Sequence, residues 1–292
     1  MRFVARTRML FASALMVLLT LPTMAFAAGE DFDPSDEFRL DQYIPLEFGP
    51  IDLSVNKAVI YMAMSSAIII GLGLFVVRRG LDLRPKGAQN VFEMAYDFTE
   101  KQIAGPTMGP KVYAKYFPYV ATLFLFILVN NLISFIPWPF APHGGTFGPI
   151  PDLGLYAATA NINVTLALAL ATFMLTHYEG VRAHGPVGYL KTMNPEAPGF
   201  IRPVIFSIEL LSQLLRLVSL SVRLFANLMA GHLLSIMAAA FSLLLGSYAG
   251  ALGIPFGVFF WVFEWLLVAG LQAFIFAMLS ALYIGYAVES SH

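Results

Sequence analysis

The fold of this chain is organised around Ile205–Ser235, which reads IFSIELLSQLLRLVSLSVRLFANLMAGHLLS. The stretch is apolar enough for lipid, yet polar residues recur along it. At about 3.6 residues per turn, five of them share one helical face. The stretch therefore predicts a long membrane helix with a polar face, made by Glu209, Gln213, Arg216, Arg223 and Asn227.

The two arginines of this face decide how it is interpreted. An arginine near mid-bilayer costs at least about 2.5–3.5 kcal/mol on insertion scales, so both should face protein or a water-filled cavity. Such residues commonly mark ion pathways. A structural role is the alternative, because polar side chains also join neighbouring helices. Glu209 lies two turns before Arg216 and could pair with it, whereas Arg223 has no acid within two turns on its own helix.

Composition defines the class of protein. The 292 residues are 58% hydrophobic and only 12% charged, whereas soluble domains carry about 25% charged residues. This predicts an all-α polytopic membrane protein that contacts lipid, and no nucleic-acid partner is expected. The absence of cysteine excludes disulfides and thiol chemistry. No internal repeat is present.

The N-terminal region divides into two predicted parts. Residues 1–27 combine basic Arg2, Arg6 and Arg8 with an apolar run and Ala-Phe-Ala, which is typical of a cleaved signal peptide. An uncleaved membrane helix is the alternative. Residues 28–54 are strongly acidic and are predicted to form an extracytoplasmic arm, so that the transmembrane domain covers residues 55–288.

Five apolar segments of this domain are long enough to cross a bilayer. Residues 88–104 are too short and too polar to span, and their apolar stripe predicts one interfacial helix. The fourth span would extend ~65 Å as a helix, twice the ~30 Å hydrocarbon thickness, so it must tilt strongly or break. The predicted spans are residues 55–77, 116–136, 155–177, 203–245 and 256–288.

Basic residues predict the orientation in the membrane. Arg78, Arg79, Arg84 and Lys86 follow the first span, which places that end in the cytoplasm. No lysine or arginine follows Arg223. The protein is therefore expected in the cell inner membrane, with the mature N-terminus outside and the C-terminus in the cytoplasm.

Two apparent site motifs carry little weight. Residues 185–192 resemble a phosphate-binding loop, but residue 190 is leucine where a glycine must precede the lysine. His177, Glu179 and His184 could be proposed as metal ligands, although such histidines are common near helix ends. No cofactor or metal is expected.

Three motifs in order resemble one family, subunit a of F-type ATP synthases. The first is Ser219-Leu-Ser-Val-Arg223-Leu-Phe-Ala-Asn227, followed by Ala230-Gly231-His232. The second, Asn161-Ile-Asn163-Val-Thr165, opens the third span. The third is Leu271-Gln272-Ala273 in the last span, with Leu282-Tyr283 after it. The resemblance covers roughly residues 40–290.

The resemblance implies a proton-translocating subunit that is not itself catalytic. It would provide two offset half-channels and a stator arginine, Arg223, that faces the ring of c subunits. The b subunits of the peripheral stalk would be further partners. The other positions implied to serve proton translocation are Glu209, Arg216, Asn227, His232, Gln272 and, with a reservation, Glu264.

The reservation concerns spacing. Many relatives with an acid or histidine in the final helix have it seven residues before the glutamine, but Glu264 is eight before Gln272 and Trp265 occupies the expected place. In an α-helix one residue rotates the side chain by about 100°, which makes the path role of Glu264 doubtful. Asn161 also stands where many relatives have aspartate. A secondary transporter with a mid-membrane charged substrate site is the alternative function, although such folds show repeats and broken helices.

Overall fold

The computed structural model describes residues 40, 42–48, 51–52, 54–82, 84–136, 156–192, 201–244, 255 and 257–289. Within them, five helices are long and apolar enough to cross a membrane. This confirms the prediction of an all-α polytopic membrane protein. The predicted signal peptide and most of the predicted arm lie outside the described residues.

The described part of the arm forms short strands before the first membrane helix. β1 (Gln42–Ile44) pairs antiparallel with β4 (Val55–Asn56), and β2 (Glu47–Phe48) pairs with β3 (Ile51–Asp52). Helix α2 (Lys57–Arg78) follows directly. The Asn56 side chain accepts a hydrogen bond from the Val59 amide at 3.1 Å and thereby caps the helix. Because strand pairing takes Val55 and Asn56, α2 begins two residues later than predicted.

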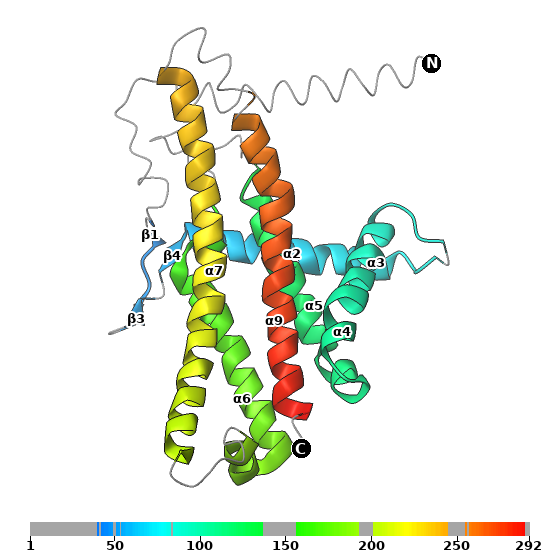
Figure 1. The fold of residues 1–292 in the computed structure, drawn as a ribbon. Helices are drawn as coiled ribbons and strands as arrows, with labels where there is room; N and C mark the ends of the chain where they lie inside the picture. Colours follow the sequence, from blue (N-terminus) through cyan, green and yellow to red (C-terminus); the bar gives the residue numbers. More distant parts are fainter. Residues whose placement is uncertain are drawn as a thin grey trace.

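The segment predicted as an interfacial helix is helical but not uniform. It contains α3 (Ala88–Phe98) and a π-helical segment, η3 (Thr99–Ala104), followed by α4 (Gly105–Thr107). Figure 1 shows these elements beside the main bundle. Phe98 packs against Phe124 and Phe274, with ring centroids 5.6 and 5.8 Å apart. On the exposed side, the hydrogen bond from Lys101 to Asp97 raises the pKa of Lys101, as expected for a polar face outside lipid.

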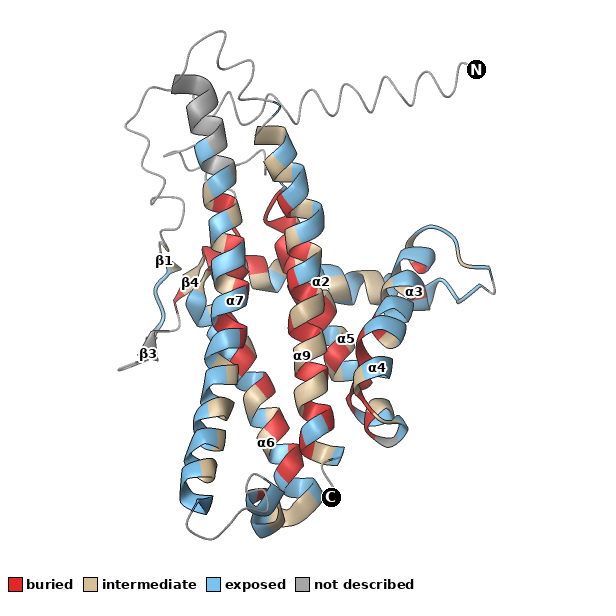
Figure 2. Cartoon of the chain, in the orientation of Figure 1, coloured by how far each residue is buried: buried red, intermediate tan, exposed pale blue. Residues whose placement is uncertain are grey.

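The core lies where α5, α6 and the last helix meet. α5 (Pro110–Ile133) packs along α9 (Ala269–Glu289), and α6 (Ile162–Thr192) contacts both α7 and α9. Figure 2 shows buried residues following these contacts. Small side chains on α9 allow the close approach, as is usual between membrane helices. The fully buried ones are Ala269, Ala273, Ala277 and Ala281.

Two helices are longer than predicted. α5 begins at Pro110, a residue suited to a first helical turn, and not at Tyr116. α6 begins at Ile162, after a short 3₁₀ segment, η4 (Ala158–Ala160), and continues to Thr192 across a kink at Gly185. Gly185 adopts φ +73°, a conformation that favours glycine. Beyond the kink the Tyr189 ring packs onto Gly180, where a Cβ atom would overlap it. This contact packs the residues after the kink against the helix before it.

α7 (Arg202–Leu244) is one continuous helix of 43 residues, so the alternative of a break is not adopted. A helix of ~65 Å remains within ~30 Å of hydrocarbon only when it tilts far beyond the usual ~20°. In Figure 1, α2 runs crosswise to α7 and α9. α2 has the length of a helix that crosses the bilayer upright. If α2 is upright, then α7 and α9, which run crosswise to it, are steeply inclined to the membrane normal.

Candidate functional site

Arg223 lies on an exposed face of α7. The residues of α7 that are buried around it recur every four positions, at Leu220, Leu224 and Leu228. Arg223 and Asn227 are exposed beside this buried stripe. Within the described part of the chain, Arg223 has no ion-pair partner. The guanidinium is therefore presented outward from the helix bundle and is not used to hold the bundle together.

His232 is a buried polar residue on the side of α7 that faces the bundle. Its side chain is 4% exposed, stacks on Phe135 at 4.5 Å between ring centroids, and lies 3.3 Å from Ser134 Oγ through Nε2. Its position nine residues after Arg223 corresponds to about 14 Å along the helix axis. His232 and Arg223 therefore do not share a site.

The end of α5 adds polar groups that the sequence interpretation missed. Thr159 donates to Asn131 Oδ1 at 2.6 Å, and the Asn131 amide donates to the Ala269 carbonyl at 3.1 Å. Ser134 belongs to the same turn and contacts His232. The available signal was the group of Asn130, Asn131 and Ser134 at the end of an otherwise apolar span.

Glu264 joins this polar region, although its spacing made that doubtful. Its side chain is 3% exposed and packs against Gly231, the neighbour of His232, so closely that a Cβ atom at 231 would overlap the carboxylate. The expected misorientation assumed a regular α-helix. The structure instead has a π-helical segment, η5 (Glu264–Val268), which absorbs one residue. Gln272, one turn into α9, is also buried.

A second polar group lies on the other side of Arg223 along α7. Gln213 donates to Glu209 at 2.8 Å, and the Arg216 guanidinium lies 5.5 Å from the centre of the Tyr283 ring. Arg216 thus stacks on α9, and the pairing with Glu209 that the sequence left open does not form. Gln213 and Arg216 also line a small cavity with His177. Its space of about 20 Å³ is enough for one water.

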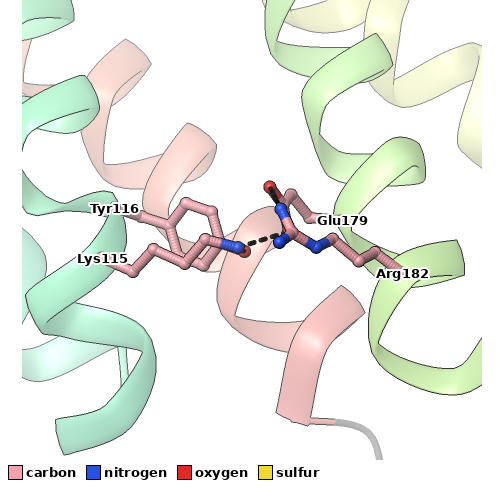
Figure 3. Close-up of polar contacts among 4 residues, drawn as sticks. All are labelled: Lys115, Tyr116, Glu179 and Arg182. Carbon is pink, nitrogen blue, oxygen red and sulfur yellow. Dashed lines mark hydrogen bonds and ion pairs between the residues drawn. The ribbon is translucent and has the colours of Figure 1, made fainter.

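A charged cluster ties α5 to α6 near the end of α9. Figure 3 shows Lys115 reaching from α5 toward Glu179 on α6, with the Arg182 side chain next to the same carboxylate. The Lys115 Nζ to Glu179 Oε2 distance is 2.6 Å, and Arg182 is 3.8 Å from Oε1. Lys115 also donates to Tyr116 Oη at 2.8 Å. The cluster was missed because its members are 64 residues apart.

Removing the lysine of this cluster should destabilise the protein. Glu179 is 8% exposed, so Lys115→Met leaves a buried carboxylate whose nearest cation is the more distant Arg182. We expect a lower thermal midpoint of the detergent-solubilised protein, measured by size-exclusion chromatography after heating. Arg182→Met is the control and should change the midpoint less, because Arg182 is 63% exposed. A midpoint unchanged by Lys115→Met would contradict a structural role for the pair.

The residues considered as metal ligands are not brought together. Glu179 is held by the cluster, whereas His177 Nδ1 lies 2.9 Å from the Phe173 carbonyl. Among the described residues, no three histidine or carboxylate side chains form a group that could hold a metal ion. Residues 185–192, which resemble a phosphate-binding loop, begin at the kink of α6 and continue as helix.

Fold and site together define a multi-pass helical membrane protein in which two separate groups of polar side chains flank an exposed arginine. Comparison with known proteins makes this class specific. The family model described as ATP synthase A chain matches residues 59–285. The chain therefore belongs to the ATP synthase A chain family.

Individual relatives agree with this assignment. ATP synthase subunit a 2 of Chlorobaculum tepidum is 36% identical over 266 residues, which is 89% of this chain and 70% of that protein. ATP synthase subunit a of Brucella canis is 36% identical over 267 residues, 89% of this chain and 99% of the relative. The Myxococcus xanthus ATP synthase subunit a is 34% identical over 247 residues, 84% and 76% of the two chains.

Proposed function

We propose that this chain is the proton-conducting stator of the membrane sector of an ATP synthase, with Arg223 facing the ring of c subunits between two offset half-channels. One observation carries the proposal. Buried or half-buried polar side chains collect at two places on α7, and the exposed Arg223 lies between them. Offset access paths separated by a fixed charge are what a rotary proton drive needs.

The first half-channel would open to the extracytoplasmic side. His232, Glu264 and Ser134 lie in one buried region, and Asn131 extends it along α5. Carboxylate, imidazole and hydroxyl groups can each accept or donate a proton. The region begins about 14 Å from Arg223 along α7, so a proton that leaves it must pass to the rotor before it meets the arginine.

The second half-channel would open to the cytoplasm. Gln213 and Arg216 line the water-sized cavity against α6, and Glu209 accepts a hydrogen bond from Gln213 one turn nearer the start of α7. Arg216 is about 10 Å from Arg223 along the helix. Its positive charge beside the cavity would favour departure of a proton outward along Glu209.

Electrostatics then couples proton flow to rotation. A rotor carboxylate enters lipid only when neutral, because a charge there costs several kcal/mol. Opposite Arg223 its ionised form is favoured, so it releases its proton. Arginine suits the role because it stays charged when buried. Asn227 is exposed beside it and can hydrogen-bond a passing carboxylate. On α9, Gln272 is the polar side chain that would serve proton translocation together with Asn227. Each proton supplies about 2.3 kcal/mol per 100 mV.

The exposed side of α7 provides the surface for the ring. Large apolar side chains without cover surround the arginine, including Val218 and Val222. The b subunits of the peripheral stalk and lipid would cover other faces. The N-terminus of the mature chain would be extracytoplasmic and the C-terminus cytoplasmic, because Arg78 and Arg79 end α2. The family match does not favour the alternative of a secondary transporter.

Thiol access tests the two half-channels, because the chain contains no cysteine. Ser134→Cys and Gln213→Cys are introduced singly, and a membrane-impermeant cationic thiol reagent is added to one side of sealed vesicles. We expect block of proton pumping at position 134 from the extracytoplasmic side and at position 213 from the cytoplasmic side. The unaltered chain is the control for reaction with other subunits. Reaction of both positions from the same side would overturn the arrangement.

A further inference from the structure

The buried residues of the final helix change their spacing at one point. From Ala269 onward they recur every three or four positions, through Ala273, Phe276 and Ser280. The step from Glu264 to Ala269 is five. The Ala269 amide correspondingly donates to the Glu264 carbonyl, which is the i to i+5 bond of a π turn. One residue more than an α-helix needs is therefore accommodated between Glu264 and Ala269.

This extra residue decides which side chain faces α7. In a regular α-helix, the position seven residues before Gln272 would point about 20° from it, and the position eight before would point about 80° away. Trp265 would then take the inward place. With one residue absorbed by η5, Glu264 takes that place, and its carboxylate lies against Gly231. Trp265 is turned toward α5.

Two hydrogen bonds hold the π segment at its ends. Trp265 Nε1 donates to the Leu132 carbonyl at 3.2 Å, beside the first residue of η5. Asn131 Nδ2 donates to the Ala269 carbonyl at 3.1 Å, just beyond the last residue. Leu132 belongs to the final turn of α5, where carbonyls lack partners within the helix. The last turn of α5 thus clamps both ends of η5.

We propose that Trp265 and Asn131 are positioning residues, which hold η5 in its π conformation so that the Glu264 carboxylate reaches α7 beside His232. The inference rests on the proposed function, in which Glu264 lines the extracytoplasmic half-channel. It adds the two contacts that hold η5, and η5 compensates for the extra residue between Glu264 and Gln272. The carboxylate acts on the proton, and the two clamp residues act only through its position.

Exchange and deletion test the device. Glu264→Trp combined with Trp265→Glu puts the acid seven residues before Gln272. With η5 retained, that acid points to α5, and we expect proton pumping per assembled complex to fall about a hundredfold. Deletion of Leu267, which is 56% exposed, removes the extra residue and should leave pumping near normal, because Glu264 keeps its place in a regular helix. A pumping exchange variant, or a deletion variant that fails to assemble or pump, overturns the inference.

Trp265→Phe keeps an aromatic ring and removes only the donor. We expect pumping to slow about fivefold, the factor typical of one hydrogen bond. Trp261→Phe is the matched control, since Trp261 stacks on Trp265 but donates to no carbonyl in the described part of the chain. Deletion of Leu267 should restore the Trp265→Phe variant, which a general loss of packing would not allow. The inference is overturned if Trp265→Phe does not slow pumping, or if deletion of Leu267 does not restore pumping to that variant. If the exchange variant does not assemble, these two results decide the inference.

Glu264→Gln separates this inference from the proposed function. We expect it to slow pumping, because an amide cannot carry the proton. Normal pumping by Glu264→Gln would remove Glu264 from the half-channel and overturn both. Slow pumping by Glu264→Gln together with a normally pumping exchange variant would overturn the positioning device alone.

Discussion

Replacing Arg223 with alanine is expected to abolish proton-driven ATP synthesis and ATP-driven proton pumping while the complex still assembles. Assembly should survive because Arg223 is exposed and makes no ion pair among the described residues. The loss of coupling follows because a rotor carboxylate opposite alanine has no partner for its ionised form. Proton release at the interface would then lose its driving force. Both activities can be measured in inverted membrane vesicles.

The same variant should also leak protons once the catalytic head is stripped from the membranes, because no fixed charge separates the two half-channels. Arg223→Lys should be nearly as defective, since lysine lacks the planar fork and can lose its proton when buried. Arg216→Ala is the control on the same helix. It removes a guanidinium that stacks on Tyr283 and should reduce the rate without uncoupling. Ordinary coupled ATP synthesis by assembled Arg223→Ala complexes would refute the mechanism.

Adding a single methyl group at Gly231 should nearly stop proton translocation. A Cβ atom there would overlap the Glu264 carboxylate and its Cγ, so either the carboxylate is displaced or α7 and the final helix separate. Displacement of a reacting group by about 1 Å can cost about a hundredfold in rate, and we expect a loss of that size for Gly231→Ala. The measurement is the pumping rate per assembled complex.

Gly270→Ala is the matched control for this change, because a Cβ atom at 270 meets nothing within 4 Å. That variant should pump at close to the normal rate. The double variant Gly231→Ala with Glu264→Asp should recover part of the activity, since the shorter acid makes room for the methyl group. Normal pumping by Gly231→Ala would show that the carboxylate does not need its place against α7.

The sequence alone determined the class of fold and singled out Arg223 as a membrane cation with no acid within two turns on its own helix. Spans of this length and hydropathy bury their backbone polar groups only as membrane helices, so five long helices followed from composition and spacing. The polar face of α7 followed from helical periodicity, because its members are neighbours along one helix. Roles for Glu209, Arg223, Asn227 and Gln272 were predicted from the family resemblance and remain predictions.

Contacts between distant segments were beyond the sequence. The helix continues beyond the kink at Gly185, and there Tyr189 packs back onto Gly180. Lys115 and Glu179 are 64 residues apart and form a pair only when α5 meets α6. Asn131 and Ser134 lie one turn apart at the end of α5, but their partners Thr159 and His232 are elsewhere in the chain.

The direction of the Glu264 carboxylate shows the difference most clearly. Counting from Gln272 along a regular helix turned it away from α7, and local sequence offered no reason for another geometry. A π turn in an apolar helix gains nothing from its own residues. It persists here because Trp265 donates a hydrogen bond to α5 and Asn131 of α5 donates one to the Ala269 carbonyl. In each bond the two residues are more than 130 positions apart in the chain. Periodicity along one helix could be predicted from the sequence, but a change of helical register held by a second helix was decided only by the tertiary structure.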